Sequence, residues 1–85
     1  MPNAMKIKPL KPELVEYLRR HQLEKKFVKA QRLFEENIEH PSLNVEVLEP
    51  KALRIYSFRI DRKYRAIFII VHGEAEIVTV TNHYA

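Results

Sequence analysis

The first half of the chain repeats its apolar residues at three- and four-residue steps, the period of a helix buried on one side. One such segment is "KPELVEYLRR", where Pro12 suits the first helical position because an N–H there would have no partner. A second segment extends from Leu23 to Glu39 and ends where Pro41 pushes His40 out of the helical region. Its apolar stripe consists of Leu23, Phe27, Ala30, Phe34 and Ile38. The pattern predicts two helices packed as an antiparallel hairpin.

The period changes to two after the second helix, which is typical of strands with one buried face. Strands are predicted in "LNVEVLE", "LRIYSFRI", "YRAIFIIV" and "EIVTVTNHY", and "MKIKPL" before the helices is a further strand candidate. The connections "DRK" and "HGEA" are short, so the last three strands form an antiparallel meander. Gly73, the only glycine, marks the second turn, where a positive φ is needed. We expect an α+β fold of order β-α-α-β-β-β, a twisted, mainly antiparallel four-stranded sheet with the helical hairpin packed on one face.

The register of the strands decides which side chains share a face of the sheet. Three-residue loops at 61–63 and 73–75 place Arg59 on the same face as Arg65. In that register Arg65 lies directly opposite His83. A basic and polar patch is therefore expected at one end of the sheet.

Loops of other lengths place different residues beside Arg65. Loops of two or four residues place Arg65 beside Asn82 and Tyr84 instead, but they separate apolar from polar residues less well. In the preferred register, the face turned to the helices carries Tyr56, Phe58, Ile60, Ala66, Phe68, Ile70, Val78 and Val80. The opposite face carries Ser57, Arg59, Arg65, Thr79, Thr81 and His83, together with Ile67, Ile69 and Ile77. Glu46 alternates with Val45 and Val47, so its side chain is expected on the opposite side of the strand from the two valines.

Length and composition indicate one small domain over residues 1–85. The leading "MPNA" is assigned no function, as either a tag remnant or an upstream start. The chain has no cysteine, so neither a disulfide nor a thiolate metal site is expected. No apolar run approaches the about 20 residues of a membrane helix, and no apolar signal core opens the chain. A cytoplasmic protein without membrane contact is expected.

The positive charge of the chain is local. The formal net charge is +4, yet residues 51–65 contain six basic residues against one acidic residue. A basic stripe of this kind is the expected footprint of a phosphate backbone, although solvated strand and turn residues give the same pattern. The stripe consists of Lys51, Arg54, Arg59, Arg62, Lys63 and Arg65.

Cleavage of RNA needs a base for the 2′-hydroxyl, a cation for the phosphate and an acid for the departing 5′-oxygen. Glu46 fits the base, Arg65 fits the cation and His83 fits the acid. Histidine titrates near neutrality, and arginine stays charged and binds phosphate through two N–H groups. Tyr84 fits stacking on a base or donation to a phosphate oxygen. This chemistry needs no metal and no cofactor.

Each of these residues also has a simpler interpretation. Glu46 can be an exposed strand carboxylate, and Arg65 can form a surface pair with Asp61 or Glu76. His83 and Tyr84 can be the frayed end of an edge strand. The remaining histidines, at positions 21, 40 and 72, are expected to be exposed helix-end and turn residues without metal-type spacing.

The segments "IYSFRIDRKYRAIFIIV" and "IVTVTNHY" resemble the RelE/ParE superfamily of bacterial toxins. The shared features are an aromatic-x-x-Arg strand, a turn, a Tyr-Arg-hydrophobic strand and a polar end to the last strand. The terminal His-Tyr is most similar to the YoeB-like branch of messenger RNA interferases. The resemblance covers most of the chain and is strongest from Ser42 onward. The chain departs from YoeB-like sequences in having no tryptophan.

The resemblance implies the toxin of a type II toxin–antitoxin system, an endoribonuclease that cuts messenger RNA in the ribosomal A site without metal. It implies the catalytic set Glu46, Arg65, His83 and Tyr84, and RNA contacts from Lys51, Arg54, Arg59, Arg62 and Lys63. It also implies a cognate antitoxin that covers the basic face with an acidic segment, and operator DNA bound only through that antitoxin. The alternative is a ParE-like gyrase inhibitor, or an inactive homologue that only binds antitoxin or DNA.

Overall fold

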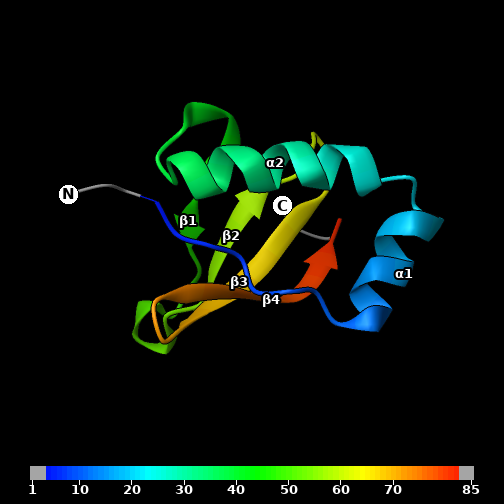
Figure 1. Ribbon diagram of the computed structural model, residues 1–85. Coiled ribbons are helices and arrows are strands. Elements are labelled where there is room, and N and C mark those ends of the chain that lie inside the picture. Colours follow the sequence, from blue (N-terminus) through cyan, green and yellow to red (C-terminus); the bar gives the residue numbers. More distant parts are fainter. Residues whose placement is uncertain (1–3, 83–85) are drawn as a thin grey trace.

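The computed structural model describes residues 4–82, which form a helical layer on a four-stranded antiparallel sheet (Figure 1). The strands lie in the order β1-β2-β3-β4. The predicted α+β architecture is confirmed. No helix in this part of the chain is long and apolar enough to cross a membrane. The elements are α1 (Pro12–Arg20), α2 (Glu24–Glu36), the 3-10 turns η1 (Pro41–Leu43) and η2 (Lys51–Leu53), β1 (Glu46–Val47), β2 (Tyr56–Arg59), β3 (Arg65–Val71) and β4 (Glu74–Thr81).

Helix α1 begins at Pro12 as predicted, whereas α2 is shorter than the predicted Leu23–Glu39. Asn37 has an extended backbone, and its side-chain oxygen accepts from the Glu39 backbone N–H at 3.0 Å. This local hydrogen bond competes with the helical one, so α2 stops before the proline is reached.

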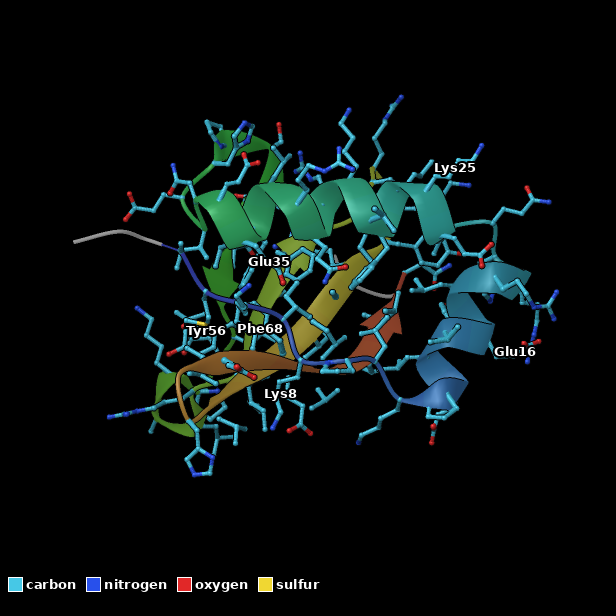
Figure 2. All side chains as sticks on the ribbon, viewed as in Figure 1. Lys8, Glu16, Lys25, Glu35, Tyr56 and Phe68 are labelled. Carbon is cyan, nitrogen blue, oxygen red and sulfur yellow. The ribbon has the colours of Figure 1, made fainter. Side chains whose placement is uncertain are left out.

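The core lies between α2 and the sheet and is centred on phenylalanine rings. Phe34 on α2 packs on Phe58 and Phe68, with ring centroids 5.0 and 5.2 Å apart. Tyr56 stacks on Phe68 at 5.4 Å, and both lie under α2 in Figure 2. The predicted stripe of α2 is buried, except that Ile38 is half-buried against the core. These contacts fix the sheet face that turns to the helices.

The segment before α1 is not the predicted strand. It forms a single parallel bridge, Ile7 to Ala75 of β4, flanked by backbone hydrogen bonds of 2.8 and 2.9 Å. The Ile7 N–H instead donates to a Glu35 carboxylate oxygen at 2.9 Å, which ties the segment to α2.

The first turn of the meander has the predicted register. Arg59 of β2 is directly opposite Arg65 of β3, with the loop at 61–63 between them. Asp61 Oδ1 accepts from the backbone N–H groups of Lys63 and Tyr64 at 2.9 and 2.8 Å. An aspartate that caps its own turn holds this loop in one conformation.

The second turn differs from the predicted loop at 73–75. It consists of His72 and Gly73, whose φ angles of 52° and 80° are both positive. Two such residues make the hairpin turn that matches the twist of the flanking strands. Ala75 therefore belongs to β4, where it is buried.

A bulge at Val78 corrects the predicted faces of β4. Thr79 pairs with Ile67 but Ile77 pairs with Phe68, so the register shifts by one residue. Ile77 is consequently 3% exposed in the core and Val78 is 37% exposed, the reverse of the prediction. The predicted pairing of Arg65 with His83 is also wrong, because Arg65 is opposite Thr81.

Candidate functional site

A cleft of about 300 Å³ lies at the end of the sheet where β2 turns into β3. It brings the predicted base Glu46 and the predicted cation Arg65 together with three of the five predicted RNA-binding residues. The lining residues are Asn44, Glu46, Arg59, Asp61, Arg62, Lys63 and Arg65. We refer to this feature as the Arg65 cleft.

Arg65 is a buried cation, only 6% exposed, so it does not have the surface position of the simpler interpretation. Its Nε donates to Ser57 Oγ at 2.9 Å, and its Nη2 donates to the Ser57 carbonyl oxygen at 3.3 Å. Nη2 also donates to the Asn44 carbonyl oxygen at 2.5 Å. A buried charge is tolerated when its donors are satisfied in this way. The guanidinium is therefore held in a fixed orientation.

Asn44 connects the two predicted catalytic residues on the described part of the chain. Its φ of 44° is left-handed, which asparagine tolerates better than most residues. Its carbonyl oxygen accepts from Arg65, while its Nδ2 donates to Glu46 Oε2 at 3.2 Å. Asn44 thus positions the carboxylate and the guanidinium at the same time.

Glu46 is half-buried on β1 and pairs with Ser57 of β2. Ser57 in turn pairs with Ile67 of β3 and is fully buried, with 0% exposure. The short strand β1 therefore brings the carboxylate to the serine that holds Arg65. Neither Asn44 nor Ser57 is assigned a role by the sequence pattern.

The turn that carries Arg62 and Lys63 is anchored to the helical layer. Lys26 Nζ of α2 forms an ion pair of 3.0 Å with Asp61 Oδ2. Partial burial raises the pKa of the Asp61 carboxyl, but hydrogen bonds from Lys26 and from two backbone N–H groups outweigh burial and hold this pKa below its ordinary value. The ionised aspartate fixes a turn whose two basic side chains are exposed.

Lys51 and Arg54 lie apart from the Arg65 cleft. Lys51 opens η2, and Arg54 follows it with a left-handed φ of 54° just before β2 begins. Arg54 lines a different cavity of about 400 Å³ with Leu53, Tyr56, Ile69 and Ile70. The six basic residues that are close in sequence are therefore divided between the two ends of β2.

Strand β4 ends at Thr81, opposite Arg65, and the predicted site residues His83 and Tyr84 lie outside the described residues. His21 is exposed at the end of α1, where its ring packs on Tyr17 with centroids 4.1 Å apart. His40 Nδ1 accepts from the Ser42 backbone N–H at 3.1 Å. Within residues 4–82, no group of three or more potential ligand side chains could hold a metal ion.

The Arg65 cleft thus combines a fixed guanidinium and three exposed cations with the carboxylates of Glu46 and Asp61. An anionic phosphodiester fits the cations, and the Glu46 carboxylate beside it can accept a proton. These are two of the three functions that cleavage of RNA requires.

A scan against family models found no match, and a search of the curated proteins found none. Solved structures do match. The YoeB dimer from Staphylococcus aureus is 18% identical, with a TM-score of 0.67, and the match covers 99% of this chain and 100% of that chain. The YoeB–YefM complex from the same organism is 21% identical, with a TM-score of 0.66 over 94% and 98% of the two chains. The Escherichia coli DinJ–YafQ toxin–antitoxin complex is 10% identical, with a TM-score of 0.68 over 98% and 94%. The chain has the fold of the YoeB and YafQ toxins, as the resemblance predicts.

Proposed function

We propose that this chain is the toxin of a toxin–antitoxin pair and an endoribonuclease that cuts messenger RNA in the ribosomal A site. The observation that carries the proposal is the Arg65 cleft, where Glu46 and a buried arginine converge with three exposed cations. The fold supports it, because similar structures are described as YoeB–YefM and DinJ–YafQ toxin–antitoxin complexes.

In the proposed reaction, the Glu46 carboxylate takes the proton of the 2′-hydroxyl. The 2′-oxygen attacks the neighbouring phosphorus, the bond from phosphorus to the 5′-oxygen breaks, and a 2′,3′-cyclic phosphate remains on the upstream fragment. His83 gives a proton to the departing 5′-oxygen, and Tyr84 stacks on a base or donates to a phosphate oxygen. The roles of His83 and Tyr84 rest on the sequence.

The two arginines of the cleft have different tasks in this proposal. Arg65 is already oriented by Ser57 and Asn44, so its charge needs no reorganisation as negative charge develops on the phosphate. Arg59 is exposed on the opposite strand, and its guanidinium binds the incoming phosphate. Arg62 and Lys63 on the anchored turn extend the same contact.

The proposal extends to partners and compartment. A cognate antitoxin with an acidic segment covers the basic surface and keeps the toxin inactive, and operator DNA is reached only through that antitoxin. Lys51 and Arg54, at the far end of β2, contact RNA outside the Arg65 cleft. The toxin acts in the cytoplasm, where ribosomes are.

Primer extension on messenger RNA from cells that express the chain tests the proposal. We expect new 5′ ends within coding sequence soon after induction, and none in uninduced cells. Uncut message in growth-arrested cells contradicts the proposal. Inhibition of DNA supercoiling by the purified chain then identifies a gyrase inhibitor, and unimpaired growth identifies an inactive homologue.

A further inference from the structure

A second cavity, of about 260 Å³, lies between α2 and the β2–β3 turn. Its floor is apolar, because Ala30, Leu43 and Ile60 are buried core residues and Leu33 is half-buried against them. Its polar lining consists of Lys26, Lys29, Ser42, Arg59 and Asp61. We refer to it as the α2 pocket.

The α2 pocket adjoins the Arg65 cleft. Arg59 and Asp61 line both cavities, so these two side chains lie at the boundary between them. The ion pair of Lys26 with Asp61 crosses from α2 to the turn at this boundary. A ligand held by phosphate in the cleft can therefore place a neighbouring group in the pocket.

The chemistry of the α2 pocket fits a nucleoside. A base has apolar faces and a polar edge, which match an apolar floor with a hydroxyl and a carboxylate at its side. Three of the five polar lining residues are cations, and Lys29 is exposed at the rim. The volume of about 260 Å³ lies just under the about 300–1,000 Å³ typical of small-ligand sites, which suits a single base with its sugar and phosphate at the rim.

We propose that the α2 pocket binds the base of a nucleotide next to the scissile phosphate, with the phosphate of that nucleotide held by Lys29. The role of the pocket in cleavage rests on the proposed function. Binding of a nucleotide to the free protein does not, because it requires neither ribosome nor reaction. The pocket thus gives the chain a means of selecting among neighbouring bases.

Nucleotide binding is tested by adding each of the four ribonucleoside 5′-monophosphates to the isotope-labelled chain and following backbone amide signals. We expect shifts at Ala30, Leu43 and Ile60 with dissociation constants on the order of 1 mM, and a preference for one base. Ribose 5-phosphate is the matched probe, with a sugar and a phosphate but no base. Equal shifts with ribose 5-phosphate overturn the proposal, because no base is then recognised.

Two lysines of α2 provide the matched variants. Lys29→Ala removes a cation from the pocket rim, whereas Lys25→Ala removes one from outside it, where Lys25 points away from the sheet in Figure 2. We expect Lys29→Ala to weaken nucleotide binding about fivefold and Lys25→Ala to leave it unchanged. Equal weakening by both variants overturns the proposal in favour of diffuse attraction to a basic helix.

Filling the α2 pocket is an independent test that removes no charge. Ser42 is exposed on η1, so Ser42→Leu adds apolar volume at the pocket without disturbing the core, and Ser42→Ala is its control. We expect Ser42→Leu to abolish the nucleotide-induced shifts and to change which sequences are cut. Cleavage with unchanged sequence preference overturns the pocket's role but leaves the proposed nuclease standing. Specific nucleotide binding without any cleavage in cells contradicts the nuclease instead and supports the pocket.

Discussion

Arg59 on β2 and Arg65 on β3 are directly opposite each other on one face of the sheet. Like charges in this relationship destabilise an antiparallel pair. The hydrogen bonds from Arg65 to Ser57 and Asn44 hold its guanidinium in this position opposite Arg59. An anion bound between the two strands removes this repulsion, which is the arrangement expected of a site that binds phosphate.

Removing Arg59 should therefore separate function from stability. We expect Arg59→Thr to keep the free energy of unfolding unchanged or to raise it by about 0.5 kcal/mol, while RNA cleavage falls. Arg62→Thr removes the same charge from the same cleft, but Arg62 lies on the turn and has no cation directly opposite. Urea unfolding of both variants makes the comparison. A loss of more than about 1 kcal/mol in Arg59→Thr would contradict the repulsion.

Glu46→Gln tests the proposed base with little structural change. Glutamine keeps an oxygen that accepts from Asn44 Nδ2 but cannot take a proton from a 2′-hydroxyl. We expect cleavage to fall about 10²–10⁴-fold, with the free energy of unfolding within about 0.5 kcal/mol of wild type. Glu49→Gln, on the exposed segment after β1, is the charge-matched control. Unchanged cleavage by Glu46→Gln would exclude Glu46 as the base.

Arg65→Ala should lose stability as well as cleavage. The buried Ser57 hydroxyl and the Asn44 carbonyl oxygen then lose their donor, which costs about 1–3 kcal/mol, and cleavage falls about 10²–10³-fold. Growth recovery alone is thus no proof of a catalytic role. Ser57→Ala loosens the same contacts while retaining the arginine, so we expect it to lose stability with a smaller loss of cleavage. Urea unfolding and cleavage are measured together; equal losses of cleavage would show that Arg65 acts only through the fold.

His83→Gln tests the proposed acid, which lies outside the described residues. Glutamine has similar reach but cannot deliver a proton, so we expect growth arrest and messenger RNA cleavage to be lost while the antitoxin still binds. His72→Gln, in the exposed β3–β4 turn, should retain both activities. Growth curves and primer extension after induction make the measurement. Continued growth arrest by His83→Gln would remove His83 from the mechanism.

The lowered pKa of Asp61 predicts how stability depends on pH. Burial opposes ionisation, but hydrogen bonds from Lys26, Tyr64 and Lys63 outweigh it, so the folded-state pKa is below the unfolded value of about 3.9. The stabilisation is therefore complete above pH ~4 and is lost as the pH falls through the folded-state value. We expect wild type to be more stable than Asp61→Asn at pH 7, with the difference closing below pH ~4. Urea unfolding across this range measures it, and a difference independent of pH would contradict the assignment.

The local sequence pattern is sufficient to predict the helices and the turn between β2 and β3. The stripe of Phe27 and Phe34 identifies α2, and a short polar loop sets Arg59 against Arg65. The same pattern fails in β4, because Ile77 and Val78 are both apolar and β-branched and either can face the core. Packing decides between them: Ala75 is buried beside Ile7, from the other end of the chain, and the bulge follows.

The local sequence pattern also predicts only part of the candidate site. Alternation along the strands predicts that Glu46 and Arg65 share a face, but Asn44 and Ser57 matter only because a distant arginine reaches them. Asparagine tolerates the left-handed region better than most residues, yet the hydrogen-bond partner of Asn44 cannot be read from its neighbours in the sequence. Proximity in the sequence places Lys51 and Arg54 in one basic stripe with Arg59. An extended strand carries residues apart at about 3.3 Å each, which is why they lie at the other end of β2.

The bridge between Ile7 and Ala75 joins the two ends of the described chain at the margin of the sheet. Closing so large a loop loses more entropy than closing the β2–β3 and β3–β4 hairpins, whose contacts are local. The two hairpins therefore form before the bridge between Ile7 and Ala75. Amide hydrogens of Lys8 and Ala75 should then exchange with solvent earlier than those of β3, so the toxin-like sheet opens from its β4 side while the strand that carries Arg65 remains protected.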